Sequence, residues 1–504
     1  MEGLLEKIYK RYNQFGEYED SFAVLDQYTM IRIYKEGKCQ PVNIETIMKA
    51  AEIQKIRNMV DAHQELLFDS MMTQPKSVFY RMYLLEIVAR AIPNSFYERI
   101  DFKADSIVEI TMAITLYYWG LQTYRFSGMP ISDSERRNLI GREDFYFGIS
   151  EIQKVRGKTT KDELEKYLSI FAKNIDEIKE EDGIGLYEDG GVPFIICIEE
   201  YLDYMIFVVE RYFRDNANAQ EYSYYTDEKG SSFEEMVYGI TKNFVQENYQ
   251  TLYYYPNDKQ KIELDVLLKD GENLAILECK SGTFSSHGVD KDDALKLQIH
   301  NKTKKAYSSL KKVSDYLKKT GEYSFSCGKE KIVGRVTEPI CIHVSMYPMD
   351  FIASNMYALF PEYFEESNPI FTISMEHLFA MLLDAKKSKK DIFDYWKQRQ
   401  KDILQHPGVY YDNNELDLYY EIVNSDKGTM LAELRKQGIL EQISPNARIV
   451  SSFHNEFGEE TRPALWMLRM LDTYILLGIL EQGKNWYGVN KRYLKNLEEY
   501  IRIG

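Results

Sequence analysis

The chain has 504 residues, more than one hydrophobic core usually organises, and 44% of them are apolar, which excludes a disordered chain. Its net charge of −16 argues against indiscriminate binding of nucleic acid by the whole surface, but it leaves room for a local basic face. No apolar run reaches the length of a membrane span, and the five cysteines lack a CxxC pair, so we expect a soluble cytoplasmic protein with no membrane partner, structural zinc or disulfide framework.

Residues 1–220 are expected to be mainly helical. Apolar residues recur at three- and four-residue spacing in 78–92 and 107–124. Thr160 and Glu163 have the spacing of a capping box at the start of a further helix. The sequence does not indicate what this region binds, and we assign to it any contact with a second copy or a partner protein.

Residues 221–355 change character and predict one α/β domain. The expected order is helix, three strands, a long basic helix and a further strand, at 231–248, 249–255, 261–268, 273–280, 292–319 and 340–347.

Two of these strands flank Asp270-Gly271, which is among the strongest signals for a two-residue hairpin loop. That loop predicts a register in which Asp265 lies opposite Ile276. Because side chains alternate along each strand, Asp265 and Glu278 then share one face of the sheet. They become diagonal neighbours, about 7 Å apart at Cα. A three-residue bulged loop would break this register.

Lys280 lies two residues beyond Glu278 and is expected on the same face. Mg²⁺ typically takes one or two carboxylates together with waters and substrate phosphate. Such a cation would relieve the repulsion between Asp265 and Glu278, and Lys280 would orient or deprotonate a water. This equipment indicates phosphodiester hydrolysis. The alternative is a structural ion pair between Glu278 and Lys280, with Asp265 an incidental surface acid.

The stretches "IELDVLL" and "LAILECKSG" resemble the PD-(D/E)XK nucleases, the restriction-endonuclease-like superfamily. In that family an acid on one strand is followed by E-x-K on the next strand. Asp265 matches the first acid, Glu278 the second and Lys280 the lysine. The resemblance covers about 230 to 350.

The resemblance implies a restriction-endonuclease-like core, a mixed central sheet flanked by helices, and Mg²⁺, with Mn²⁺ as the alternative metal. It also implies that the main-chain carbonyl of Cys279 is a metal ligand. Leu264 stands where many members have a proline, a frequent departure.

A glutamate on the preceding helix, often directly after an aromatic residue, is a further feature of the family. Glu234 and Glu235 follow Phe233. The apolar stripe of this helix has Glu234 at its edge and Glu235 about twice as far round. We therefore favour Glu234 as the supporting catalytic and metal-binding acid, with Glu235 as the second choice and two solvated acids as the third.

The helix after the E-x-K motif carries a basic patch. Residues 296–335 contain eleven lysines and arginines against three acids, a local surplus of eight positive charges. Beside a nuclease site these side chains would contact phosphates, whereas a solvated helix face is the usual meaning of such a run. The lysines we assign to nucleic-acid binding are Lys302, Lys304, Lys305, Lys311 and Lys312.

Many members of the family carry a glutamine on this helix. Here Ser308 and Ser309 occupy the comparable place, and Gln298 lies a few turns earlier, so the role is left unassigned. His287, in the segment after Lys280, reads more simply as a loop histidine than as a site residue.

Residues 356–504 return to helical patterns. Near the end, a strong helical pattern at 463–480 is followed by two short apolar runs around 483–485, which a hairpin would join. Helix followed by hairpin is the end of a winged-helix module, so 460–504 is read either as a winged helix or as a plain helical subdomain.

Together these features predict a metal-dependent nuclease, most directly a DNA endonuclease serving restriction, phage defence or a mobile element. Two alternatives remain: a nuclease acting on RNA or branched structures, and a non-catalytic nucleic-acid-binding or scaffold protein on a nuclease fold.

Overall fold

The computed structural model describes most of the chain from residue 76 on. The described residues are 76–126, 146–174, 185–195, 198–257, 260–282, 292–336, 338–363, 369–405, 410–411, 414–423, 448–449, 453–454, 460–461, 463–481, 488–490 and 492–493. They form two compact units. One contains residues 76–229 and the described residues from 469 on, and the other runs from 230 to 468.

The described residues 76–229 of the first unit are mainly helical, and residues 1–75 of the region predicted to be helical lie outside the described chain. The helices of this unit are α5 (Val78–Ala91), α6 (Asn94–Arg99), α7 (Ala104–Phe126), α9 (Ile149–Val155), α10 (Lys161–Phe171) and α11 (Ile198–Asn216). Two further helices, α12 (Ala219–Thr241) and α20 (Pro463–Glu481), contribute residues to both units.

The start of α5 shows how the end of the chain belongs to this unit. Ser77 caps the helix by accepting a hydrogen bond from the Tyr80 amide, which satisfies one of the free N–H groups of the first turn. Asp472 of α20 accepts from Ser77 Oγ at 2.6 Å and from the amides of Val78 and Phe79 at 3.1 and 2.8 Å. A carboxylate at a helix N-terminus is favourable because the helix dipole is positive there.

The helical unit also contains a small sheet that the sequence did not predict. Its strands are β1 (Lys173–Asn174), β2 (Leu186–Asp189) and β3 (Val192–Ile195). Gly190 and Gly191, both at positive φ, form the turn between β2 and β3. Two consecutive positive φ values fit a type I′ hairpin turn, which glycine adopts without steric cost.

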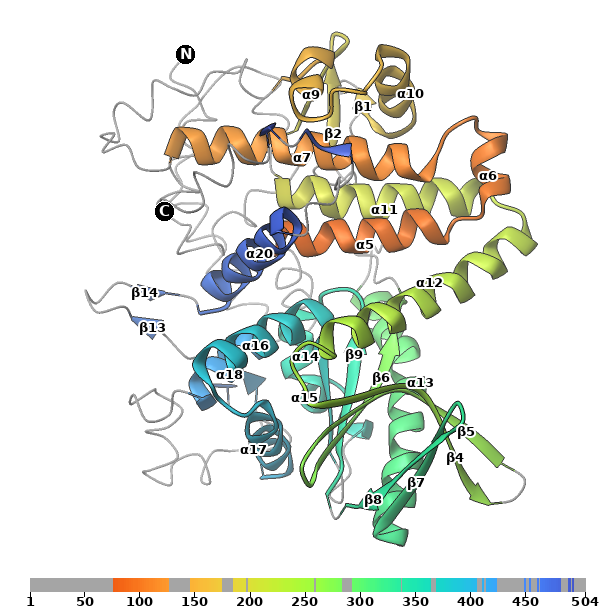
Figure 1. The fold of residues 1–504 in the computed structure, drawn as a ribbon, viewed down its shortest axis with the longest axis vertical. Coiled ribbons are helices and arrows are strands. Elements are labelled where there is room, and N and C mark those ends of the chain that lie inside the picture. The colour runs from red at the N-terminus through yellow and green to blue at the C-terminus, as the bar shows by residue number, and fades with distance from the viewer. Residues whose placement is uncertain are drawn as a thin grey trace. The chain divides into compact units, whose positions relative to one another are not determined.

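The second unit is built around a seven-stranded sheet (Figure 1). Its strands are β4 (Glu247–Asn257), β5 (Gln260–Asp270), β6 (Asn273–Lys280), β7 (Glu322–Cys327), β8 (Glu330–Arg335), β9 (Ile340–Ser345) and β10 (Ile370–Ser374). The strand order is β10-β9-β6-β5-β4-β7-β8. The β6–β9 and β9–β10 pairs are parallel and the others antiparallel, so the sheet is mixed, as expected.

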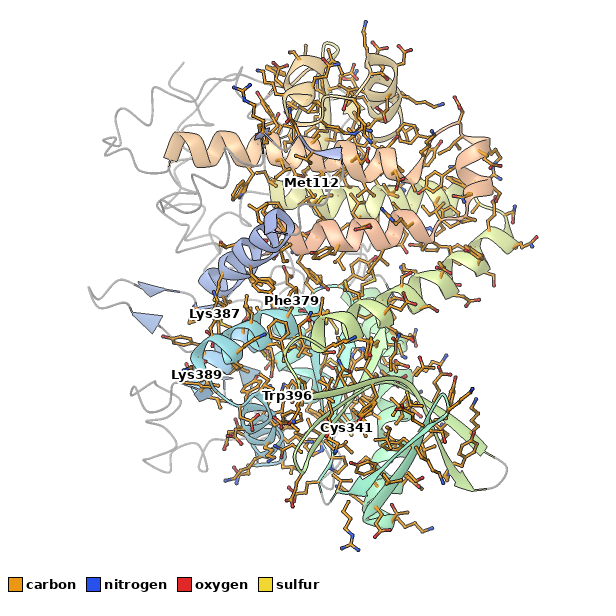
Figure 2. The ribbon with its side chains drawn as sticks, in the orientation of Figure 1. Met112, Cys341, Phe379, Lys387, Lys389 and Trp396 are labelled. Atoms are coloured by element: carbon orange, nitrogen blue, oxygen red, sulfur yellow. The ribbon has the colours of Figure 1, made fainter. Side chains whose placement is uncertain are left out.

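Six helices of this unit lie between its later strands or after them in the chain. They are α13 (Asp292–Thr320), α14 (Asp350–Ser354), α15 (Met356–Leu359), α16 (Met375–Ser388), α17 (Ile392–Gln405) and α18 (Glu415–Val423). Strands β9 and β10 are buried along their whole length, and Cys341 of β9 lies within the packed interior (Figure 2). Because β10 pairs with β9, the sheet extends past the boundary at 355 that the sequence indicated.

The β5–β6 hairpin differs from prediction in its register by two residues. Asp270 pairs with Asn273 and Leu267 with Ile276, so the loop is Gly271-Glu272. The predicted pairing of Asp265 with Ile276 is therefore wrong. Gly271 has φ of 57°, and glycine at the first loop position fits a type II′ turn. A shift of two residues leaves the alternation of side chains between the faces unchanged.

Helix α13 packs on one face of β6, β9 and β10. Tyr307 Oη lies 3.0 Å from Thr372 Oγ1, and the Cys341 thiol donates to the Leu310 carbonyl at 4.0 Å. Figure 1 shows α13 as one continuous helix running alongside the sheet.

The turn of the predicted hairpin, around 483–485, lies outside the described residues. Residues 478–481, which include the first of its two apolar runs, are the last turn of α20. Residues 482–487 lie outside the described chain, as does His287. None of the helices in the described ranges is long and apolar enough to cross a membrane.

Candidate active site

The β5–β6 hairpin brings Asp265 and Glu278 together at the end of its ladder. The last pair that forms is Val266 with Leu277, and Asp265 and Glu278 are the next residues on each strand. Beside Asp265, on β4, Thr251 has φ of 53°. A β-branched residue at positive φ is strained, and such strain concentrates at functional sites.

Asp265 is held by the neighbouring strand. The Cys279 amide donates to its Oδ2 at 2.7 Å. Burial raises the pKa of Asp265 to about 8, and the negative charges of Glu278 and Glu234 add to the effect, whereas Lys280 and the Cys279 amide oppose it. The Asp265 carboxylate is therefore surrounded by more negative charge, from Glu278 and Glu234, than the positive charge of Lys280 offsets.

Glu278 is the best-held acid of the site. It is only 7% exposed. Lys280 Nζ donates to its Oε1 at 2.6 Å, and Ser309 of α13 donates to its Oε2 at 3.1 Å. The side chain is thus fixed from both the sheet and the helix.

Lys280 lies between acids. Burial by itself would lower the pKa of this ammonium, but the charges of Glu278 and Asp265 outweigh it, so the pKa is raised. Its Nζ also donates to the main-chain carbonyl of Cys279 at 3.1 Å. The carbonyl that was predicted as a metal ligand therefore accepts from the predicted catalytic lysine.

Helix α12 contributes Glu234. Burial raises the pKa of this half-buried acid, and Glu263 and Glu278 raise it further, against the opposing charge of Lys280. Glu235 is exposed. The structure thus brings Glu234 within the electrostatic field of the hairpin acids.

The donor set suits a hard divalent cation. The site offers carboxylate oxygens of Asp265 and Glu278 and the Cys279 carbonyl, and its acids repel one another. In the described chain, no three His, Cys, Asp or Glu side chains are placed to hold a metal together. A metal held by the carboxylates of Asp265 and Glu278 would complete its shell with water or substrate, which is typical of Mg²⁺.

Two residues of the site were missed by sequence reasoning. Ser309 was noted only as a place where the family has glutamine, and its bond to Glu278 depends on how α13 packs on β6. His343 pairs with Glu278 across the parallel β6–β9 ladder. Burial, with the charge of Lys280, lowers the pKa of His343 to about 3, so its imidazole is neutral.

The predicted basic patch lies mostly on α13, with Lys331 and Arg335 on β8. Lys304, Lys305, Lys311 and Lys312 are exposed, on the side away from the sheet. Lys302 differs, because its side chain lies against Gly282, two residues beyond Lys280; a Cβ at Gly282 would lie 3.2 Å from Lys302 Cδ. Lys302 is therefore the patch residue that adjoins the hairpin end.

Comparison with known proteins covers part of the chain. A domain family of unknown function, DUF4143, matches residues 229–332, which include the β5–β6 hairpin and α13. No curated protein matches. Protein VC1899 from Vibrio cholerae is similar at 15% identity over 66% of this chain, with a TM-score of 0.19, too low to establish a shared fold. The matched part spans 62% of that protein's length.

Proposed function

We propose that this chain is a metal-dependent nuclease that hydrolyses phosphodiester bonds, and that its substrate is DNA. The observation that carries the proposal is the surplus of acid around Asp265, whose pKa is raised to about 8 by burial, Glu278 and Glu234. Buried acids that serve stability alone are normally paired. A buried group of acids with one lysine favours a site that takes up a cation.

The residues divide the work between metal and water. Asp265, Glu278 and the Cys279 carbonyl would hold Mg²⁺ or Mn²⁺, with Glu234 supporting them from α12. A divalent cation bound there supplies Lewis-acid stabilisation of charge on the phosphate. Ser309 holds Glu278 in one orientation through its 3.1 Å bond. The raised pKa of Lys280 keeps its ammonium charged at neutral pH, which favours orienting a water over deprotonating it.

The basic patch supports a polyanionic substrate. Lys302 lies beside the strand that ends at Lys280, and the exposed lysines of α13 continue away from it. Phosphate contacts position a nucleic acid on a protein without reading its sequence. An endonuclease of restriction, phage-defence or mobile-element type fits these features by analogy alone.

Cleavage assays test the proposal directly. Plasmid DNA, single-stranded DNA and RNA are incubated with the protein across a Mg²⁺ titration, beside the Asp265→Ala and Glu278→Ala variants. We expect Mg²⁺-dependent cleavage of plasmid by the wild type and none by either variant. Preferential cleavage of RNA would replace the DNA assignment, and no cleavage of any substrate with Mg²⁺ or Mn²⁺ would contradict the nuclease.

A further inference from the structure

The exposed side of α13 carries lysines in pairs with a fixed repeat. Residues 304–319 read "KKAYSSLKKVSDYLKK", so two lysines recur every seven residues. The pairs are Lys304 with Lys305, Lys311 with Lys312, and Lys318 with Lys319. We call these six residues the lysine ladder.

All six ladder residues are exposed. Seven residues make about two turns of helix with a drift of about 20°, so the three pairs form one stripe along α13. Successive pairs are about 10.5 Å apart and the whole ladder is about 22 Å long, at 1.5 Å per residue. The opposite side of the helix is buried at Ala306, Leu310, Val313 and Leu317.

The described residues supply no salt bridge to five of the six ladder lysines. Within the described ranges, no acidic residue forms an ion pair with Lys304, Lys305, Lys312, Lys318 or Lys319. Asp315 is the one exposed acid among the described residues 300–320. In a chain of net charge −16, six exposed lysines that share their stretch of helix with one acid form a surface complementary to a polyanion.

The composition of the stripe discriminates between polyanions. Proteins that bind single strands combine positive charge with exposed aromatic residues on which bases stack. Among the described residues 300–320, the exposed positions other than the ladder are Asn301, Ser308, Asp315 and Thr320, and none is aromatic. Tyr316 is half-buried and packs against Tyr254, with ring centroids 4.9 Å apart. A straight cationic stripe without stacking residues fits the phosphates of a duplex.

We propose that the lysine ladder binds the backbone of double-stranded DNA independently of sequence, and so restricts the nuclease proposed above to duplex substrates. This inference rests on that proposed function for its biological meaning, but it concerns binding alone. A ladder about 22 Å long spans about six base pairs at 3.4 Å each. Lys302, beside Gly282, joins the ladder to the strand that carries Lys280.

The inference adds Lys318 and Lys319 to the phosphate-binding residues. Both lie in the last turn of α13, where lysine also stabilises the helix dipole. A role in the dipole alone would lower the melting temperature on substitution and leave DNA binding unchanged. A role in the ladder predicts that substitution weakens DNA binding and leaves the melting temperature unchanged.

Binding measured without divalent metal separates this inference from the cleavage chemistry. The full-length protein in EDTA is titrated with a fluorescent DNA duplex, the matching single strand and an RNA duplex, at several salt concentrations. The test variants are Lys304→Gln/Lys305→Gln and Lys318→Gln/Lys319→Gln. The matched control is Lys387→Gln/Lys389→Gln, two exposed lysines at the end of α16 (Figure 2).

We expect the DNA duplex to bind more tightly than the single strand or the RNA duplex. Each ladder variant should flatten the slope of log K against log salt by about 1.8, because each lysine releases about 0.9 counterion on B-DNA. The control should leave affinity and slope unchanged. The inference is overturned if Lys318→Gln/Lys319→Gln binds like the control, if the single strand or RNA duplex binds as tightly, or if no DNA binds. Normal ladder-dependent binding without any cleavage would overturn the nuclease proposal and leave the ladder standing.

Discussion

Two clusters of buried charge, one in each unit, are built in opposite ways. In the helical unit, Arg156 Nη1 donates to Glu163 at 2.9 Å and Nε to Glu109 at 2.9 Å, and Lys158 pairs with Glu109 at 2.8 Å. Two cations therefore meet two acids. Burial alone would raise the pKa of Glu163, but the bonds and charge of Arg156 lower it below the ordinary value.

In the α/β unit three acids face one cation. Asp265, Glu278 and Glu234 share Lys280, and the pKa of Asp265 rises to about 8 instead of falling. Fully ionised, this group has a charge of minus two, which a single divalent cation would neutralise. The comparison teaches that burial and ion pairing do not by themselves indicate a metal site. The net negative charge that remains after pairing does.

Among the variants that keep the metal, the largest effect we expect is on cleavage by Lys280→Ala. Removing a fixed donor that orients the attacking water and stabilises developing charge typically costs about 10²–10³-fold, and this variant should lose activity in that range while retaining Mg²⁺ binding. Lys269→Ala is the matched control, since Lys269 lies on the same hairpin, pairs with Glu247 at 2.7 Å and is 24% exposed, against 27% for Lys280. Plasmid cleavage under single-turnover conditions measures both. Equal activity of Lys280→Ala and wild type would make the site an ordinary ion pair like that of Lys269.

In the helical unit the same kind of change should affect stability alone. Arg156→Ala leaves Glu109 and Glu163 without their shared partner, and breaking a buried pair in this way costs about 3–5 kcal/mol. Lys158→Ala removes a cation that is 57% exposed and should cost about 0–1 kcal/mol. Denaturation followed by circular dichroism gives both values. A small loss for Arg156→Ala would mean that the balanced cluster is not structural.

A smaller effect is expected from Ser309→Ala, which sharpens the comparison within the site. Removing the bond to Glu278 should leave that acid less well oriented and lower cleavage about tenfold, near the weaker end of hydrogen bonds to charged groups. Ser308→Ala is the control, because Ser308 is the exposed neighbour on the same helix. A shift in the Mg²⁺ concentration for half-maximal cleavage accompanies the loss if Ser309 acts through Glu278. Identical behaviour of the two variants would remove Ser309 from the site.

A separate effect concerns the pH dependence of stability. The pKa of Asp265 is about 8 in the folded protein, against an ordinary 3.8, so the folded state increasingly resists its ionisation as pH rises from about 4 to about 8. In EDTA, Asp265→Asn should therefore melt at a higher temperature than wild type, by a margin that grows over this range. Asp270→Asn, at the other end of β5, provides the control. A margin that stays constant with pH would mean that the acids do not strain the fold.

Much of the α/β unit could be predicted from local sequence. Apolar runs mark β5, β6 and β9, and E-x-K at the end of β6 marks the candidate site. The exact register could not be predicted, because Asp270-Gly271 and Gly271-Glu272 are both acceptable two-residue loops. The shift of two residues preserved the predicted proximity of Asp265 and Glu278 because it preserved the side-chain alternation.

What the sequence missed depends on contacts between distant segments. Strand β10 belongs to the sheet only through its parallel pairing with β9, which no local pattern encodes. Ser309 gains its role from the packing of α13 on β6, and Asp472 caps α5 across almost the whole chain. Gly328 lies at positive φ in the turn of the β7–β8 hairpin and is a residue typical of such turns. The hairpin was not predicted, because its lysines were counted with the basic patch of 296–335.

Calorimetric titration with Mg²⁺ tests most directly whether the excess of negative charge around Asp265 forms a metal site. The wild type, Asp265→Asn and Glu278→Gln are titrated at neutral pH. Arg156→Ala, which changes the charge cluster of the helical unit, is the control and is titrated below its melting temperature. We expect the wild type and Arg156→Ala to bind one Mg²⁺ in the α/β unit, and both site variants to lose it. Binding that persists in Asp265→Asn and Glu278→Gln, or a wild type that takes up neither Mg²⁺ nor Mn²⁺, would contradict the account.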